Sequence, residues 1–202
     1  LDSEGNWRTP FNPRASNHRN DDYCEGTAWQ WTWFVPHDVD GLVELMGGRD
    51  AFIGKLDSLF TADSKLAGES TSVDISGLIG QYAHGNEPSH HIAHLYNYVG
   101  QPWRTQEIVD EVLHTLYFNN PDGLSGNEDC GQMSAWYILN AMGFYQVCPG
   151  KPVYSIGRPL FNEATVHLKD GKSFKVIAHN NSRDNKYVRS IVLNGNKLET
   201  PF

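Results

Sequence analysis

Apolar residues recur at helical spacing over the first three quarters of the chain. The clearest pattern lies at 105–118, where six apolar side chains fall three or four positions apart and Thr105 and Glu107 favour a helix start. Gly47 and Gly143 follow two other patterns and are typical helix stops. Pro88 is acceptable in the first turn of a further helix. The predicted helices span 41–46, 50–60, 88–98, 105–118 and 132–142.

Near residue 148 the pattern changes to an alternation of apolar and polar residues, which is typical of strands. Asp170-Gly171 and Asn194-Gly195 lie between alternating segments and favour hairpin turns. Two hairpins cannot bury both of their faces, so we expect them to join a sheet whose other strands lie outside this chain. The predicted strands span 164–168, 173–178, 188–193 and 197–198.

These patterns predict a helical segment at 1–147 and a β-strand segment at 148–202 that is truncated. The chain starts at Leu1 without an initiator Met or a signal peptide, and it ends at Phe202 without a tail. Both ends are interpreted as cut, which makes the missing remainder of the same polypeptide an expected partner. No apolar run approaches the ~20 residues that cross a bilayer, so no membrane span is expected.

Composition narrows the classes of function. The 16 basic and 24 acidic residues give a net charge of −8, and the basic residues are scattered, which argues against nucleic-acid binding. Aromatic residues make up 12% of the chain, which fits either a large core or a surface on which sugars stack. The cysteines Cys24, Cys130 and Cys148 cannot all pair with one another, and no CxxC spacing predicts structural zinc.

Three long loops rich in glycine, asparagine and acidic residues join the predicted helices, and such loops often carry functional sites. In the first loop, Glu25 precedes three tryptophans at alternate positions. A carboxyl beside aromatic surface is desolvated and holds its proton more tightly, which suits a general acid. The alternative is that Glu25 caps a helix while Trp29, Trp31 and Trp33 fill the core. The loops span 17–26, 77–87 and 119–131.

The second loop combines candidate metal ligands. Asn86 and Glu87 offer hard oxygen atoms of the kind that Ca²⁺ prefers. His90 and His94 share a predicted helical face, which could indicate zinc, but no glutamate follows His90 as the HExxH motif requires. The alternative is a capped helix start with buried, hydrogen-bonded histidines.

The third loop places Asn127, Glu128 and Asp129 directly before a predicted helix. A carboxylate at a helix N-terminus stays ionised, which suits a base that activates water. The alternative is helix capping by Asn127 and Asp129. One carboxyl held neutral and one held charged are the basic equipment of glycoside hydrolysis, although sequence spacing does not distinguish a retaining from an inverting pair.

The loops and their flanks contain four long motifs, which are EGTAWQW at 25–31, VPHD at 35–38, HGNEPSHH at 84–91 and GNEDCGQMSAWY at 126–137. In this order they resemble glycoside hydrolase family 92, the calcium-dependent exo-α-mannosidases, and the resemblance covers most of residues 8–200. It implies a mainly α fold in which 1–147 is the C-terminal part of an (α/α)6 catalytic barrel. The segment 148–202 would then join a β-sandwich.

The resemblance implies removal of terminal α-linked mannose from mannose-containing glycans such as N-glycans, with α-1,2 linkage as one option. It implies inversion by single displacement, with Ca²⁺ helping to distort the mannose ring. Glu25 matches the general acid and Asp129 the general base. Glu87, together with Asn86, matches the calcium-binding segment. Export to the periplasm, the cell surface or the medium is the habit of the family.

Four substrate-binding residues are also implied by the resemblance. His84 matches a sugar-contacting position, but its neighbour is Gly85, where an acidic residue would accompany α-1,2 specificity. Trp29, Asn127 and Glu128 are the other expected contacts. Asn127 stands where relatives often carry a second acid, which leaves a single expected base.

Family members are much longer than this chain, so the fragment alone is expected to be inactive. Two other classes of function stay open. The first is a calcium-dependent carbohydrate-binding module that uses the tryptophans without catalysis. The second is a different (α/α)6 sugar hydrolase, of the trehalase or glucoamylase kind, that acts on glucosides without calcium.

Overall fold

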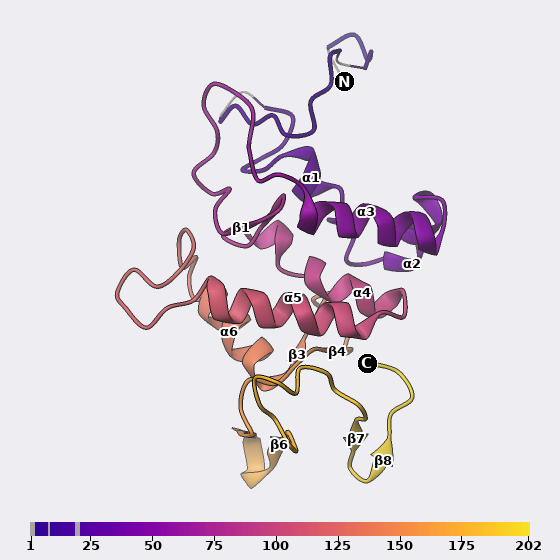
Figure 1. Cartoon of the computed structure of the whole chain (residues 1–202), viewed down its shortest axis with the longest axis vertical. Helices are drawn as coiled ribbons and strands as arrows, with labels where there is room; N and C mark the ends of the chain where they lie inside the picture. Colours follow the sequence, from indigo (N-terminus) through magenta and orange to yellow (C-terminus); the bar gives the residue numbers. More distant parts are fainter. Residues whose placement is uncertain (1–2, 8, 19–20) are drawn as a thin grey trace.

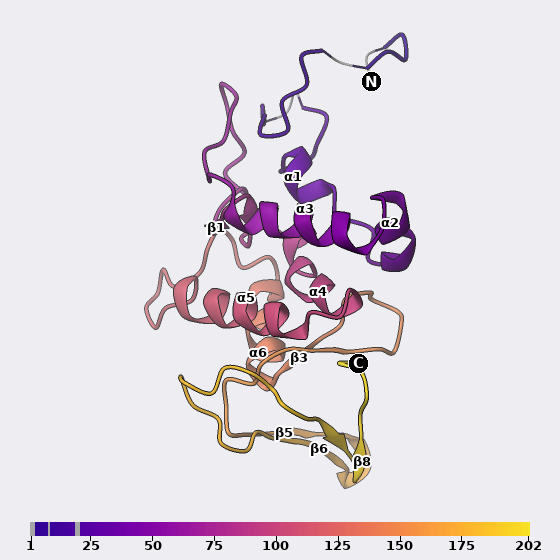
Figure 2. The same ribbon diagram turned by 45° about the vertical axis from the view of Figure 1, so that its right-hand side comes forward.

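The computed structural model describes residues 3–7, 9–18 and 21–202, and it arranges the chain in three tiers (Figure 1). Helices α1 to α3 form the first tier, α4 to α6 form the second, and two β-hairpins form the third. The tiers keep this order in the turned view (Figure 2). Within the described residues, no helix is both long enough and apolar enough to span a membrane. The helices span Ala28–Trp31 (α1), Val39–Leu45 (α2), Arg49–Thr61 (α3), Leu95–Tyr98 (α4), Pro102–Thr115 (α5) and Gln132–Met142 (α6).

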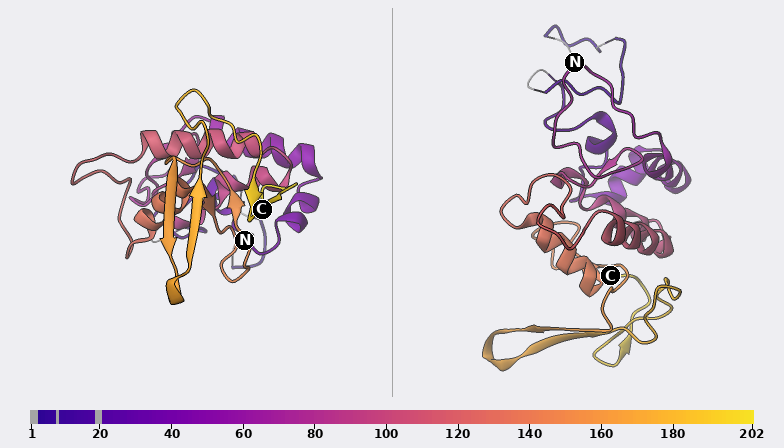
Figure 3. Two further views of the ribbon diagram at one scale, coloured as in Figure 1. Left: turned by 90° about the horizontal axis from the view of Figure 1, so that it is seen from below. Right: turned by 60° about the vertical axis from the view of Figure 1, so that its left-hand side comes forward.

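The strands of the described chain form separate two-stranded antiparallel sheets. The pairs β1–β2 and β3–β4 lie among the helices, whereas β5–β6 and β7–β8 form the third tier (Figure 3). Because each sheet has two strands, the larger β-sandwich and the complete barrel stay predictions. The strands span Leu78–Ile79 (β1), Tyr82–Ala83 (β2), Phe144–Tyr145 (β3), Ser155–Ile156 (β4), Glu163–His167 (β5), Ser173–Ile177 (β6), Val192–Leu193 (β7) and Asn196–Lys197 (β8).

Local signals predicted α6 and the positions of both hairpin turns correctly, but β7 is much shorter than the predicted strand at 188–193. Helix α6 has the predicted bounds and ends at Gly143, whose φ of 98° is left-handed. The hairpin turns use the two predicted dipeptides. Asp170 and Gly171 have φ of 61° and 70°, and Asn194 and Gly195 have φ of 50° and 84°. Positive φ at both residues fits the two-residue turn at 194–195, whereas Asp170 and Gly171 belong to a three-residue loop closed by the bond from Leu168 N–H to Lys172 O.

Helix α5 begins three residues earlier than predicted, at Pro102, because a first-turn residue does not need the N–H that proline lacks. The predicted start at Thr105 is therefore wrong. Thr105 is buried within the helix. Glu107 does not mark the first turn but pairs with Arg104 at 2.6 Å.

The prediction of one continuous helix at 88–98 is also wrong. Two 3₁₀ turns, η1 (Glu87–Ser89) and η2 (Ile92–His94), precede the short helix α4. The N–H groups of His90 and His94 each bond to the carbonyl three residues back, at 3.0 Å. These breaks turn the two histidines towards different partners, which removes the shared face that could have indicated zinc.

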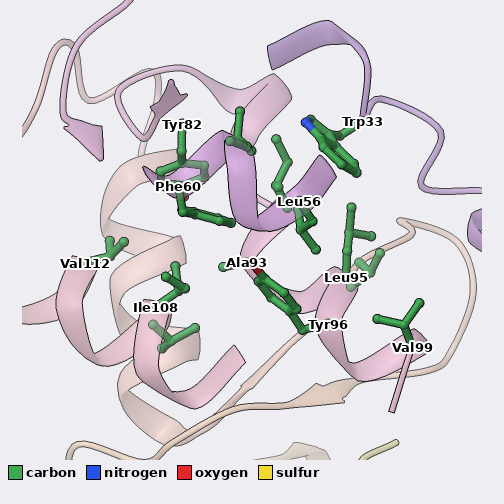
Figure 4. Packing of buried hydrophobic residues seen from close by; sticks show 14 of the residues in the cluster. Trp33, Leu56, Phe60, Tyr82, Ala93, Leu95, Tyr96, Val99, Ile108 and Val112 are labelled. Carbon is green, nitrogen blue, oxygen red and sulfur yellow. The ribbon is translucent and has the colours of Figure 1, made fainter. Parts of the chain in front are cut away.

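The hydrophobic core lies between the first and second tiers (Figure 4). Trp33 and Phe52 are fully buried, and their rings meet edge to face with centroids 5.3 Å apart. Phe60 of α3 lies near Tyr96 of α4, with ring centroids 6.1 Å apart. Aliphatic side chains of α5, including Val112, complete the contact between the tiers.

Two buried histidines before α4 bond to α6, to β4 and to the second loop. His94 Nε2 lies 2.8 Å from Asn140 Oδ1 of α6, and its Nδ1 lies 3.0 Å from Ser155 Oγ of β4. His90 Nε2 lies 3.0 Å from the carbonyl oxygen of His84. Burial lowers the pKa of His90 and of His94 to about 4. Both rings are therefore neutral at pH 7.

Polar contacts also fix the chain after β4 to helix α5. Asp110 of α5 pairs with the buried guanidinium of Arg158, which also donates to the carbonyl of Ser182 at 2.8 Å. Glu107 accepts a hydrogen bond from the Tyr187 hydroxyl at 2.6 Å. The helical and β-strand segments are thus joined through one face of α5.

Replacing Arg158 should weaken this junction strongly, because Arg158→Met leaves the Asp110 carboxylate buried with less compensation. We expect a loss of about 3–5 kcal/mol in the opening free energy of α5, measured by hydrogen exchange in the full-length protein. The matched control is Lys175→Met, since the Lys175–Glu163 pair at 2.7 Å is largely exposed. That control should change the opening free energy by less than about 1 kcal/mol. Equal effects of the two variants would contradict this account.

Acid should destabilise the helical tiers. The pKa of His90 and His94 is about 4 in the folded protein, against about 6.5 in an unfolded chain. The unfolded chain therefore binds more protons between these values. Stability is retained above about pH 6.5 and falls as the pH drops towards 4, by up to about 3 kcal/mol per histidine.

Urea unfolding of the full-length protein between pH 7 and pH 4.5 measures this loss. His94→Gln removes one of the two protonation sites and should reduce the pH dependence by about half of the pair's contribution. A stability that does not change over this range would contradict the argument.

Candidate active site

The first loop holds Glu25 in an unusual backbone conformation directly before α1. Its φ is 52°, in the left-handed region that non-glycine residues seldom occupy. Two side chains bond the carbonyls on either side of its α-carbon. Trp31 Nε1 donates to Cys24 O at 2.9 Å, and Asn86 Nδ2 donates to Glu25 O at 2.8 Å.

A capping box fixes the start of the helix that follows Glu25. Thr27 Oγ1 accepts from the Trp29 N–H at 3.2 Å, and Gln30 Oε1 accepts from the Thr27 N–H at 2.7 Å. Gln30 is buried, and its amide also donates to the carbonyl of Gln81. The local sequence thus anchors the residues just after Glu25 to the second loop.

The tryptophans do not desolvate Glu25 as expected. Trp33 is buried in the core, and Trp31 points its N–H at the Cys24 carbonyl. Trp29 is half-buried, and the ammonium of Lys55 lies 5.5 Å from its ring centroid. The Glu25 side chain is left exposed. The alternative that the tryptophans fill the core is therefore correct for Trp33. The expectation that they shield the Glu25 carboxyl is wrong for this chain.

In the second loop, Asn86 is the N-cap of η1 and is only 7% exposed. Its Oδ1 accepts from the Glu87 N–H at 3.0 Å, while its Nδ2 is bonded to Glu25 O. The Glu87 side chain is exposed. Burial first, and then the negative charge of Glu87, raise the pKa of Tyr145. Glu87 therefore lies close to strand β3, and its side chain is accessible.

His84 is fully buried, and both ring nitrogens have partners. Nδ1 lies 2.8 Å from the Tyr82 hydroxyl, and Nε2 lies 2.7 Å from the Tyr117 hydroxyl. Burial, and then the neighbouring His90, lower the pKa of His84 well below its usual value. In this arrangement His84 offers no free ring nitrogen to a sugar hydroxyl.

The third loop turns through three successive left-handed residues before α6. The φ values are 52° at Asp129, 56° at Cys130 and 95° at Gly131. Glu128, not Asn127 or Asp129, supplies the carboxylate that caps the helix. Its oxygens accept from the backbone N–H and the hydroxyl of Ser134, both at 3.0 Å. Asp129 is exposed just ahead of the helix N-terminus.

The second and third loops can touch because Gly85 and Gly126 have no side chains. A Cβ at Gly85 would overlap the Ser76 hydroxyl and would lie 2.9 Å from Ser125 O. A Cβ at Gly126 would lie 3.2 Å from Gly85 O. Since Asn86 also bonds to Glu25 O, all three predicted loops converge on residues 85 and 86.

Glu25 also lines a surface hollow of about 440 Å³. Asp21 and Asp22, the acids that precede it, lie in the same hollow, and so does His18, which the sequence did not single out. Asp129 does not line it. A separate hollow of about 510 Å³ lies along α5 and contains none of the predicted site residues. The hollow beside Glu25 is therefore the better candidate for part of the site.

The cysteines are free, with Cys24 and Cys130 exposed and Cys148 partly exposed. In the part of the chain that is described, no three or more His, Cys, Asp or Glu side chains gather where they could hold a metal ion. A calcium ion would thus need oxygen donors besides the His, Cys, Asp and Glu side chains of the described residues.

The sequence profile described as the glycosyl hydrolase family 92 catalytic domain matches residues 1–202. The fold is similar to that of a family GH92 α-mannosidase from Bacteroides thetaiotaomicron in complex with mannoimidazole. The identity is 44% and the TM-score 0.90, over 99% of this chain and 27% of that chain. A family GH92 inverting mannosidase of the same organism is 43% identical, with a TM-score of 0.79 over 96% of this chain and 27% of that chain.

An uncharacterized secreted glycosidase of Arthroderma benhamiae is 30% identical over 174 residues, which are 85% of this chain and 20% of that protein. The chain therefore spans about a quarter of the length of the solved relatives and a fifth of the fungal one. Because the profile match extends over the whole of it, the chain belongs to glycosyl hydrolase family 92.

Proposed function

We propose that this chain carries the general acid and the general base of an inverting α-mannosidase that removes terminal mannose from mannose-containing glycans. The observation that carries the proposal is the convergence of the Glu25, Asn86 and Asp129 loops on one place in the fold. The similarity to an α-mannosidase and to an inverting mannosidase supports the reaction class. Since this chain spans about a quarter of those proteins, the active form is the full-length protein.

In the proposed reaction, Glu25 donates its proton to the glycosidic oxygen as the bond to the anomeric carbon breaks. Asp129 accepts a proton from a water molecule, whose oxygen attacks that carbon from the opposite face. The products are a free alcohol and mannose of inverted configuration. The backbone of each acid lies in the left-handed region, and each side chain is exposed.

Calcium is part of the proposal, with Glu87 as its ligand from this chain. The exposed carboxylate of Glu87 has the hard oxygens that Ca²⁺ prefers, and six to eight such oxygens are needed in all. Asn86 fits less well, because its amide is buried and bonded at both ends. When bound, the ion would help to hold the mannose ring in a distorted shape.

The four other predicted substrate-binding residues are proposed to act in different ways. Asn127 is exposed beside Asp129 and can meet a sugar hydroxyl directly. Glu128 is engaged with Ser134, and His84 with two tyrosines, so both would act by shaping the site. Trp29 is half-buried and can offer only part of its ring. Export is proposed from the secreted fungal relative, and α-1,2 linkage stays one option.

The first test is release of mannose from α-linked mannobioses by the full-length protein, followed by NMR. We expect β-mannose as the initial product, loss of activity with EDTA, and recovery with Ca²⁺. Initial α-mannose would contradict inversion, and activity unaffected by EDTA would contradict the calcium proposal. Binding of mannosides without any release would instead favour a carbohydrate-binding module.

Substitution of the two acids tests their roles. Glu25→Gln and Asp129→Asn keep the size of each side chain but remove proton transfer, so each should lower kcat by about 10²–10⁴-fold. The matched control is Glu44→Gln, an exposed acid on α2, which should leave kcat unchanged. Full activity of either site variant would refute its assignment.

A further inference from the structure

The amide of Asn86 is bonded at both ends while being almost completely buried. Its Nδ2 donates to Glu25 O at 2.8 Å, across 61 residues of sequence, and its Oδ1 accepts from the Glu87 N–H at 3.0 Å. The residue is 7% exposed. A buried amide with both groups satisfied has one favoured orientation, because turning it over would lose both bonds.

The backbone around Glu25 is held from a second side as well. Trp31 Nε1 donates to Cys24 O at 2.9 Å, so the carbonyls before and after the Glu25 α-carbon are each fixed by a side-chain N–H. Gly26 makes this possible, since a Cβ there would lie 2.7 Å from Trp31 Nε1. A left-handed residue such as Glu25 persists only where its surroundings hold it.

We propose that Asn86 is a positioning residue for the general acid and not a calcium ligand, an inference that rests on the proposed role of Glu25. Together with Trp31 it forms a backbone clamp, defined as the two bonds to Cys24 O and Glu25 O. The clamp holds the Glu25 α-carbon in the left-handed conformation. The exposed Glu25 side chain has no comparable support of its own, so its aim depends on its backbone.

The expected effect on the reaction is specific. Protonation of the leaving oxygen needs the carboxyl within hydrogen-bond reach, and a displacement of about 1 Å can slow a reaction by about 10²-fold. A leaving group that departs without protonation does not need the acid. A loosened clamp should therefore slow the hydrolysis of ordinary glycosides far more than that of activated aryl mannosides.

Asn86→Asp separates the two possible roles of this residue. The aspartate keeps an oxygen for the Glu87 N–H but places an oxygen opposite the Glu25 carbonyl, where the amide N–H had been. The clamp bond is thus replaced by repulsion. If Asn86 bound calcium instead, the added carboxylate would strengthen the site, since Ca²⁺ prefers charged oxygen ligands.

For the full-length Asn86→Asp protein we expect kcat on a mannobiose to fall about 10–100-fold, with KM changed less than about threefold. With a dinitrophenyl α-mannoside the loss should be less than about threefold. The Kd for Ca²⁺, measured by calorimetry with the metal alone, should stay within about threefold. Amide hydrogen exchange at residues 24–27 should become faster.

Trp31→Phe removes the other clamp bond without adding charge, and it should give the same pattern with a smaller loss of kcat. It also keeps the proposal testable if Asn86→Asp does not fold. The matched control is Asn12→Asp, because Asn12 is exposed and its Oδ1 accepts from the nearby Arg14 N–H at 3.0 Å. That control should change none of the four measurements.

Tighter or weaker calcium binding in Asn86→Asp, with exchange at 24–27 unchanged, would overturn the proposal and make Asn86 a ligand. Equal losses on the mannobiose and the aryl mannoside would overturn it too, because they indicate general damage to the site. Failure of the underlying function has a different signature. In that case Glu25→Gln itself shows no dependence on the leaving group, while hydrogen exchange still reports whether the clamp exists.

Discussion

The structure depends on hydrogen bonding of the buried polar side chains between residues 84 and 97. His91 Nε2 lies 2.8 Å from the carbonyl of Trp33, which follows α1 in the first tier. The carbonyl of His90 accepts a hydrogen bond from Trp136 of α6 at 2.9 Å. Asn97 donates to the carbonyl of Ile156 in β4 at 2.9 Å. A buried polar group without a partner is costly, so each of these contacts allows few alternatives. This one segment thereby joins the first tier, helix α6 and strand β4.

Predictions from the sequence are correct where several local signals agree, and they fail in the segment 84–97, where long-range hydrogen bonds decide the structure. Helix α6 has both helical spacing and a glycine stop, and the hairpins have turn dipeptides, so short-range information was enough. The segment 88–98 has an acceptable proline and apolar residues at suitable spacing, yet it breaks into turns. His91 and His94 bond to partners 46 to 61 residues away, and no local pattern specifies such partners.

The candidate site was predictable as three loops but not as an arrangement of side chains. The sequence indicated Glu25 and Asp129, and it allowed Asn127 or Asp129 to cap α6. The choice of Glu128 as the cap follows from the left-handed backbone at 129–131, which turns its carboxylate back onto the helix. Likewise, tryptophans adjacent to Glu25 in sequence were expected to cover its carboxyl. Instead, Trp33 is buried in the core and Trp31 bonds to the Cys24 carbonyl.

The positions of two cysteines allow the distance between the acid and base loops to be measured. Cys24 and Cys130 are exposed, unpaired, and each is the immediate neighbour of a proposed catalytic carboxyl. Thiol-directed spin labels at these two sites would report the separation of the acid and base loops from native residues, once the partly exposed Cys148 is replaced by serine. The distance between the labels, followed as substrate binds, would show whether the acid loop and the base loop move towards each other in solution.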